Sequence, residues 1–414
     1  MKVKNISFKY RLNPTEKQKE FIEGQINFTR VMYNCMLDET FQIIKNNSSL
    51  SKEDRPKFKI PSYGKYSQMY DWSKPYIRCC LDYEQRSLSE AVFRWFDILK
   101  SGSINPKTGK FDPDYGKPKF KKRRDKNSFR LRARDVVLLD DNTITIPKID
   151  EPFKIIKHRP IPENLIKYGT VTIKRESSYK YYIVFTLEVE DYPEIENVDH
   201  TSNKIIAIDL GIRNRMVYET DDGKIGYFPN PKNYKKYNDR LVFYSKKASR
   251  QQNGSNRQKI TYLKKAKLEE QLKNARNYLL NNISTDLIRK YDTIILEDLK
   301  VQDIVQQTNK TFKNVSIKAR HNINRATYDV GWYMFTQMLL YKGAWNNRNV
   351  YLIDTKNKTV QTCSNCGFIN KEMVDVNIRD FDCPECGSHF DRCENACHNI
   401  LKLYRQGKIK NYIK

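Results

Sequence analysis

Two pairs of cysteines near the carboxyl end of the sequence constrain its fold more than any other feature. Their spacing is Cys-x2-Cys-x16-Cys-x2-Cys, and Gly367 and Gly387 follow the two pairs. Such pairs with glycine turns are typical of a zinc site, and four thiolates complete a tetrahedron with no position left for a catalytic water. We therefore predict a structural zinc ribbon over 360–390, for which His389 is an unnecessary alternative ligand. The predicted ligands are Cys363, Cys366, Cys383 and Cys386.

The charge balance indicates a polyanionic partner. The chain has 414 residues, with 76 Lys and Arg against 49 Asp and Glu, which gives a formal net charge of +27. Each phosphate that a cation neutralises releases counterions, so an excess of this size favours nucleic acid as the partner. Aromatic residues make up 12% of the chain, and rings among lysines suit base stacking. The alternative is a basic protein whose charge serves only solubility.

The densest run of positive charge lies at 117–134, with ten Lys or Arg and one Asp. Such a run is commonly a solvated face or a disordered arm. Phe120 and Phe129 within it, and the strand pattern that follows, favour an ordered basic surface that contacts nucleic acid. The predicted contact residues are Lys117, Lys119, Lys121, Lys122, Arg123, Arg124, Lys126 and Arg130.

The first half of the chain predicts a small β-domain interrupted by helices. Residues 2–11 alternate as a strand does, and Thr15 with Gln18 forms a capping-box pattern at the start of a helix. A second helix is predicted at about 86–100, and 170–189 reads as a β-hairpin. The stretch 46–66 is predicted to be a loop.

The second half predicts a sheet with helices, followed by the ribbon. Apolar strands are expected at 204–211, 293–296 and 350–353, and a meander runs through 215–228. Helical periodicity covers about 258–290 and 329–343, and a last helix follows the ribbon. The chain is thus expected to be an α+β protein of several domains.

Three acids recur at comparable places in this second half. Asp209 and Glu297 each end an apolar strand, and Asp391 opens the last helix. One acid after one strand is weak evidence, but strand ends that meet at one sheet edge bring such carboxylates together. A pocket of this kind suits Mg²⁺, which takes a few carboxylate oxygens and leaves room for phosphate. We predict a two-metal phosphodiester-hydrolysing site with these three acids as catalytic residues.

The apolar runs and the cysteine count indicate the cellular compartment and the state of the remaining cysteines. No apolar run approaches the roughly 20 residues that span a bilayer, and the first residues lack a secretory apolar core. Nine cysteines without such a signal indicate a reducing compartment. We expect an intracellular protein, in the cytoplasm or, in a eukaryotic host, the nucleus, and no membrane partner. Cys35, Cys79, Cys80, Cys393 and Cys397 are expected to be packed thiols.

The order of these motifs resembles the TnpB family, the OrfB-type putative transposases related to compact type V CRISPR nucleases. The resemblance runs nearly end to end, although each motif alone is modest. It implies a β-barrel wedge domain (1–14 and 115–195) with a helical recognition insertion (15–114). It further implies a RuvC-like, RNase H-fold nuclease domain over 200–414, into which the ribbon is inserted. The motifs are Leu12–Gln18, Gly116–Lys121, Ile208–Ile212, Leu296–Leu299, Gln361–Gly367 and Asn395-Ala with Asn399-Ile400.

The resemblance also implies an activity and its partners. These are Mg²⁺-dependent, RNA-guided DNA cleavage linked to transposition and recombination, a guide RNA from the transposon end, and a DNA target. Asp209 and Glu297 match the first two catalytic acids of the family, whereas Cys393 stands where the third is expected. Asp391 and Glu394 are its possible replacements, and the alternative for Asp391 is a plain N-cap of the last helix. A cysteine there also favours a second hypothesis, a guided DNA-binding repressor that does not cut; a third is a zinc-ribbon DNA-binding protein without RNA.

Overall fold

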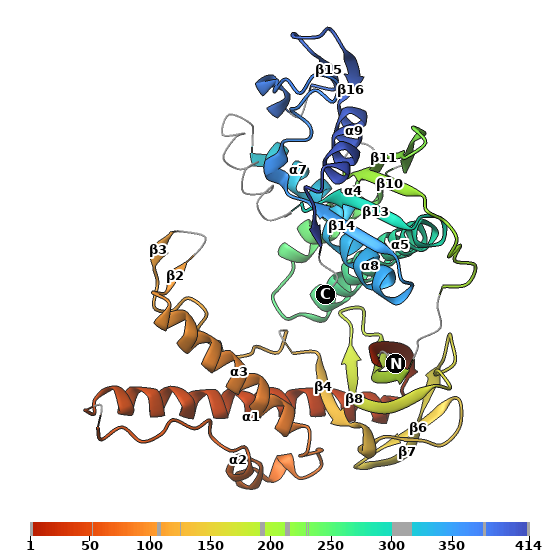
Figure 1. Ribbon diagram of the computed structural model, residues 1–414. Coiled ribbons are helices and arrows are strands. Elements are labelled where there is room, and N and C mark those ends of the chain that lie inside the picture. Colours follow the sequence, from red (N-terminus) through yellow and green to blue (C-terminus); the bar gives the residue numbers. More distant parts are fainter. Residues whose placement is uncertain are drawn as a thin grey trace. The chain divides into compact units, whose positions relative to one another are not determined.

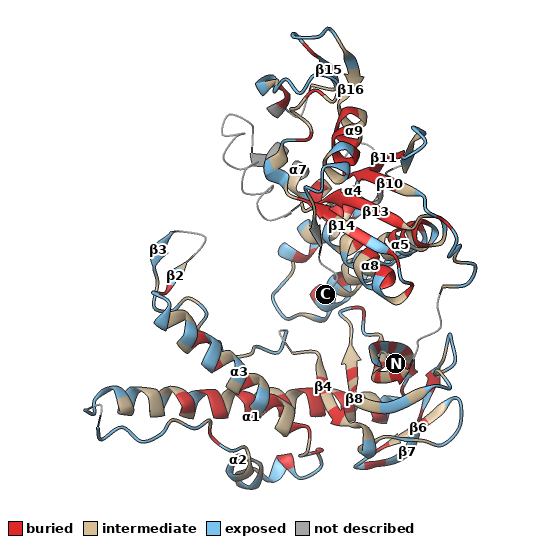
Figure 2. Cartoon of the chain, in the orientation of Figure 1, coloured by how far each residue is buried: buried red, intermediate tan, exposed pale blue. Residues whose placement is uncertain are grey.

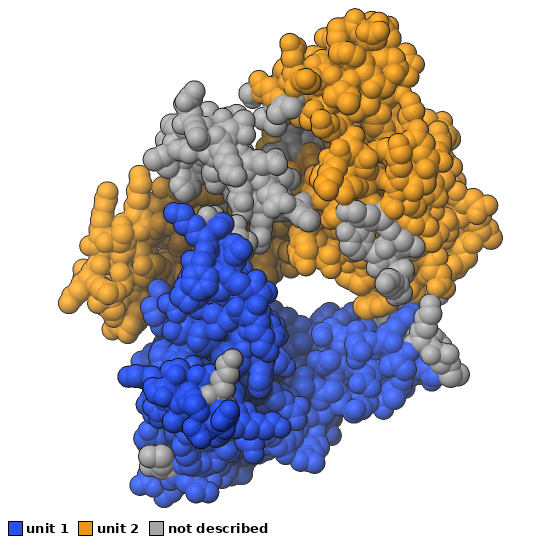
Figure 3. Space-filling model, turned by 60° about the vertical axis from the view of Figure 1, so that its left-hand side comes forward, with its two compact units in different colours: residues 1–192 blue, residues 193–414 orange. Residues whose placement is uncertain are grey.

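The chain divides into two compact units, Met1–Tyr192 and Pro193–Lys414, coloured separately in Figure 3. The computed structural model (Figure 1) describes residues 3–51, 53–105, 109–124, 126–190, 195–211, 216–228, 230, 232–299, 317–375 and 378–411. Each unit is described by itself below. Ile212 and Arg215 of the predicted motifs lie outside the described residues.

Unit 1 is built on a seven-stranded sheet of order β4-β8-β9-β1-β7-β6-β5. All its strand pairs are antiparallel. Along β9 buried and half-buried residues alternate without a break, which places one face of the strand on the core. The strands are β1 (Val3–Asn13), β4 (Ser128–Arg132), β5 (Val137–Leu138), β6 (Thr143–Ile146), β7 (Ile149–Ile156), β8 (Leu165–Arg175) and β9 (Tyr181–Glu190).

Helices α1 (Glu16–Ser48), α2 (Gly64–Met69) and α3 (Leu81–Lys100) complete unit 1, with a short hairpin of β2 (Ile104–Asn105) and β3 (Lys110–Phe111). The predicted capping box is confirmed, since Thr15 and Gln18 satisfy each other's backbone N–H groups. α3 begins before the predicted position 86, and α2 interrupts the predicted loop 46–66.

Unit 2 contains a six-stranded mixed sheet of order β12-β11-β10-β13-β14-β17. β10, β13 and β14 run parallel to one another, and the other three strands pair antiparallel. The middle of the sheet is buried (Figure 2). Its strands are β10 (Ile205–Asp209), β11 (Met216–Thr220), β12 (Ile225–Phe228), β13 (Thr293–Glu297), β14 (Asn349–Ile353) and β17 (Lys410–Asn411).

Helices cover both faces of this sheet. Side chains such as Ile206 and Ile294 pack with α5 (Asn256–Lys290) and α8 (Trp332–Trp345), whereas their neighbours Ala207 and Ile295 pack with α9 (Arg392–Arg405). This follows from the strand period of two, which makes a strand buried on both sides apolar throughout. Mixed α and β content is therefore confirmed.

Two helical predictions in unit 2 change. The predicted helix 329–343 is divided at Gly331, which lies between α7 (Ile317–Val330) and α8. Its φ of 78° is not helical and therefore ends α7. α4 (Asn233–Ser249) forms where no helix is predicted. The ribbon carries β15 (Asp380–Asp382) and β16 (His389–Asp391), which pair antiparallel. Within the described ranges, no helix combines the length and the apolarity that crossing a bilayer needs.

Candidate functional site

Asp209 and Glu297 lie side by side at the carboxyl ends of two adjacent parallel strands. Ile208 of β10 pairs with Leu296 of β13, so the next residue of each strand is an acid. Both side chains are buried, at 6% and 7% exposure. Burial raises the pKa of Asp209, and burial together with the charge of Asp209 raises that of Glu297. The two carboxylates therefore destabilise each other when both are ionised.

Each of these acids accepts one hydrogen bond from a neighbouring side chain. The Cys393 thiol, on the first turn of α9, donates to Asp209. The Thr359 hydroxyl donates to Glu297. The positive charges of Arg392 and Arg379 act to lower the pKa of Asp209, but among the described residues neither arginine forms an ion pair with it. Cys393, predicted to be a packed thiol, is a free and partly buried thiol that contacts a predicted catalytic acid.

Asp391, the third predicted acid, is the N-cap of α9. Its Oδ1 accepts from the backbone N–H of Cys393 at 2.8 Å and of Glu394 at 3.3 Å. Its charge still acts on Asp209 and raises the pKa of that carboxyl. Within the part of the chain that the structure describes, however, these three acids do not bring their oxygens as close together as the ribbon cysteines bring their sulfurs. Glu394 accepts from the hydroxyl of Tyr227.

Two buried asparagines of α9 hold the loop that carries Thr359. Asn399 Nδ2 donates to the Thr359 carbonyl at 2.8 Å and to the Thr362 carbonyl at 2.6 Å. Asn395 Nδ2 donates to the Thr362 carbonyl at 2.8 Å, and its Oδ1 accepts from Ser364 N at 2.9 Å. These side chains thus fix the hydroxyl that contacts Glu297. Sequence reasoning gave the two asparagines no role, although their spacing of four residues on a helix indicates a shared face.

The four ribbon cysteines form a compact cluster. Their sulfurs all lie within 4.8 Å of one another, with 3.7 Å between Cys363 and Cys386 and 3.6 Å between Cys366 and Cys383. Sulfurs at about 2.3 Å from a tetrahedral ion are roughly 3.8 Å apart, so this cluster can hold a metal such as zinc. His389 instead lies 2.6 Å from Asp382 and is not part of the cluster.

Three family models match parts of the chain. One described as a probable transposase, OrfB_IS605, covers 184–308. A Cas12f1-like TNB domain covers 332–400, and the helix-turn-helix domain of OrfB_IS605 covers 1–49. In the structure, the segment 1–49 contains one strand, β1, followed by one long helix, α1, which takes up most of it.

Curated relatives agree with these models. A putative RNA-guided DNA endonuclease of Streptomyces pristinaespiralis is 25% identical over 395 residues, 95% of this chain and 88% of the relative. The putative RNA-guided DNA endonuclease InsQ of Escherichia coli (strain K12) is 25% identical over 286 residues, 69% of this chain and 67% of InsQ. TnpB-like protein L79 of Acanthamoeba polyphaga mimivirus is 26% identical over 240 residues, 56% of this chain and 43% of that protein. Together, these models and relatives support a TnpB-family protein.

Among solved structures, a Cas12f1–sgRNA–target DNA complex matches over 94% of this chain and 83% of the other, with 14% identity and a TM-score of 0.48. The predicted nucleic-acid residues lie in unit 1, in the connection that leads into β4 and in β4 itself.

Four of those eight basic side chains contact other side chains of unit 1 as follows. Lys121 and Lys126 reach the buried Glu84 at 3.1 Å and 2.5 Å. Arg130 donates to the Ser87 hydroxyl at 2.6 Å. Lys117 pairs with Asp114 at 2.8 Å. Lys119, Lys122, Arg123 and Arg124 are the exposed members of the eight.

Proposed function

We propose that this TnpB-family chain is an RNA-guided DNA endonuclease whose metal site includes Asp209 and Glu297. The observation that carries the proposal is the pair itself: two buried carboxylates at adjacent strand ends that repel each other. The names of the relatives as RNA-guided DNA endonucleases and the net charge of +27 support nucleic-acid substrates. On this proposal the partners are a guide RNA from the transposon end and a DNA target, and the activity serves transposition.

The two acids fit a hard divalent cation such as Mg²⁺. Both offer oxygen ligands, and among the described residues neither has a Lys or Arg in an ion pair that would neutralise it. A cation of charge two would remove the repulsion that raises their pKa values. Bound there, Mg²⁺ supplies a water activated for attack on the phosphodiester and charge that stabilises the leaving oxygen.

The chain's own side chains hold these acids in place. Thr359 orients Glu297 through Oε1 and leaves the second carboxylate oxygen for a ligand. Cys393 orients Asp209. Asp391 is proposed as the third acid, through its charge beside Asp209 and through the carboxylate oxygen Oδ2 that the cap does not use. The sheet order of unit 2 and the position of α9 support a RuvC-like fold for 200–414, and unit 1 supports the proposed wedge and recognition parts.

The test is cleavage of a target by the protein purified together with the RNA encoded by its flanking DNA. Asp209→Ala and Glu297→Ala are expected to reduce Mg²⁺-dependent cleavage by about a hundredfold or more, because a lost carboxylate leaves metal and phosphate charge unbalanced. Target binding should remain. Cleavage that survives both substitutions would refute the proposed site.

Asp391 needs a control that separates its charge from its capping role. Asp391→Ala removes both, whereas Asp391→Ser keeps a good N-cap without the carboxylate. If Asp391 is a metal ligand, both variants lose cleavage as fully as Asp209→Ala does. If only the cap matters, Asp391→Ser cuts like the unmodified protein.

A guided DNA-binding protein that does not cut is the second candidate, and the position of Cys393 favours it. A thiol stands beside Asp209 where the family resemblance expects an acid, and thiolates suit zinc rather than Mg²⁺. On this candidate the unmodified protein binds its target without cutting. Cys393→Asp would then begin to cut.

We propose that the metal in the ribbon is zinc and that it is structural. Metal analysis of freshly purified protein should find one zinc per chain, and Cys363→Ser should lower it towards zero together with the yield. Ser364→Ala, at the next position, is the matched control. Absence of zinc from the unmodified protein would contradict the assignment.

A further inference from the structure

A cavity of about 520 Å³ lies in unit 2 where the hairpin of α4 and α5 meets α7. Its apolar floor continues the seam of the hairpin, in which Leu241 of α4 packs with Leu268 and Leu272 of α5. The volume falls within the range of roughly 300–1,000 Å³ that is usual for ligand sites. The function proposed above does not use it.

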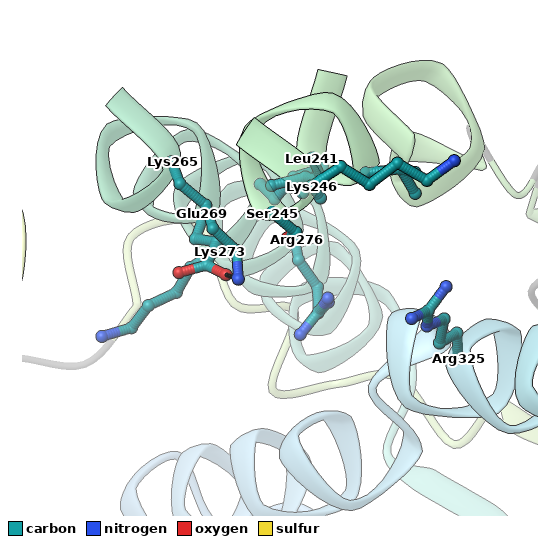
Figure 4. A pocket seen from close by; sticks show the side chains of 10 residues that line it. Leu241, Ser245, Lys246, Lys265, Glu269, Lys273, Arg276 and Arg325 are labelled. Atoms are coloured by element: carbon teal, nitrogen blue, oxygen red, sulfur yellow. Dashed lines mark ion pairs between the residues drawn. The ribbon is translucent and has the colours of Figure 1, made fainter. Parts of the chain in front are cut away.

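The rim of this cavity is strongly basic. Five cations line it against one acid, Glu269, and that acid is already 3.6 Å from Lys265. Figure 4 shows Lys246 and Lys273 extending away from the hollow in different directions, with Arg325 on the α7 side. The cations are Lys246, Lys265, Lys273, Arg276 and Arg325.

Arg276 has a donor without an acceptor. One terminal nitrogen of its guanidinium pairs with Asp329 at 2.9 Å, while its Nε is buried and makes no hydrogen bond to any described residue. A buried donor left without an acceptor is costly. An anionic oxygen in the cavity is the type of acceptor that a guanidinium favours.

The positive charge continues beyond the cavity along the hairpin. Residues 233–290 contain fifteen Lys or Arg and four Asp or Glu. On α5, Lys265, Lys273 and Arg276 share one helix face, which covers about 16 Å at 1.5 Å per residue. That length matches roughly five phosphates of one strand. Exposed rings, Tyr262 at 50% and Phe243 at 57%, stand on the same two helices, where bases can stack on them.

We propose that this cavity binds backbone phosphates of a nucleic-acid strand. A polymer fits better than a small anion, because the cations extend along the helix beyond the hollow. The inference rests on the proposed function only in naming nucleic acid as the partner. It does not require cutting, so it can be tested without the metal site.

The experiment compares two double variants of the full chain with equal loss of charge. Lys246→Gln with Lys273→Gln changes the rim, and Lys247→Gln with Lys267→Gln changes exposed lysines on the same two helices that do not line the cavity. Affinity is measured by fluorescence anisotropy at several salt concentrations. The probes are single-stranded RNA, single-stranded DNA and an RNA–DNA duplex of one sequence.

The rim variant is expected to bind at least about tenfold more weakly, and the salt slope should fall by between about 1 and 2. In the control variant, the salt slope should fall by less than half as much. Both variants should keep their melting temperatures and guided cleavage chemistry. Equal weakening in both variants, or none in either, would overturn the proposal. The probe with the largest difference identifies the strand as RNA or DNA. Loss of cleavage with normal binding in Asp209→Ala would concern the metal site alone.

Discussion

Both units of the protein bury carboxylates, and one buried site in each unit is built in the opposite way to the other. In unit 1, Glu84 is 2% exposed and pairs with Lys126 and Lys121. Burial raises the pKa of Glu84, but the two ammonium groups outweigh that effect and lower it. In unit 2, Asp209 and Glu297 are almost as buried, have no such pairs among the described residues, and have raised pKa values.

This difference separates a structural acid from a candidate ligand. Where the chain supplies its own cations, as at Glu84, burial costs are offset within the fold. Where it places two acids together and withholds the cation, the folded state stores repulsion that an external ion can relieve. The predictions below test whether this contrast governs stability.

The largest effect is expected at Glu84. Glu84→Gln keeps the size of the side chain but leaves Lys121 and Lys126 without a negative partner in a mostly buried position. We expect a loss of about 3 kcal/mol in the free energy of unfolding, or a fall of roughly 6–12 °C in the melting temperature of unit 1. Calorimetry checks this, with the exposed Glu90→Gln of the same helix as the control. Equal melting of the two variants would show that the pairing contributes nothing.

At Asp209 the expected change is smaller and has the opposite sign. In protein dialysed free of Mg²⁺ without a chelator, so that a ribbon metal stays, Asp209→Asn should stabilise by about 1–2 kcal/mol because it removes the repulsion with Glu297. The exposed Asp239→Asn is the control. Added Mg²⁺ should raise the melting temperature of the unmodified protein and leave Asp209→Asn unchanged. A destabilised Asp209→Asn would contradict the contrast.

The pH dependence of these differences should also be opposite. A raised pKa in the folded state contributes stability that is present below the unfolded value, about 4, and is lost as the pH rises through the folded value. The advantage of Asp209→Asn should therefore be near zero at pH 4 and grow towards pH 8. For Glu84 the pKa is lowered, so the deficit of Glu84→Gln should shrink as the pH falls below about 4. Melting curves across this range provide the measurement.

The smallest change in stability is expected at exposed basic residues of the run 117–134, which also contains Lys121 and Lys126. Lys119→Gln with Arg123→Gln should alter the free energy of unfolding by less than about 0.5 kcal/mol. If these residues contact nucleic acid as predicted, the salt slope of binding should fall by between about 1 and 2. Lys121→Gln with Lys126→Gln is the comparison, and it should instead lower the melting temperature. An unchanged slope in Lys119→Gln with Arg123→Gln would assign the exposed part of the block to solvent.

The pairing of Asp209 with Glu297 could be anticipated because it depends on local pattern. An apolar strand that ends in an acid is visible in the sequence, and parallel neighbours bring their ends together. The third position could not be settled in this way. A shift of two residues on a helix rotates a side chain by about 200°, so only the observed start of α9 shows that Cys393 contacts Asp209 while Asp391 caps the helix.

Contacts between distant segments account for most of what the sequence did not reveal. Glu84 lies outside the helix predicted at 86–100 and pairs with lysines 37 and 42 positions away. The basic run 117–134 was therefore predicted to be a single exposed surface. Helix α4 was missed because it is mostly polar, and its contact with α5 rests on Leu241 and two partly buried tyrosines. No periodicity within α4 itself indicates the partner that stabilises it.

The ribbon leaves unit 2 and returns to it at nearly the same place. Asn395 and Asn399 hold the segment that leads into it, and β16 runs directly into the helix that carries both asparagines. A loop whose two ends are anchored together can change its length at little entropic cost. In evolution or engineering, the ribbon can therefore be exchanged or resized without displacing Asp209 and Glu297, whereas the two asparagines have no such freedom.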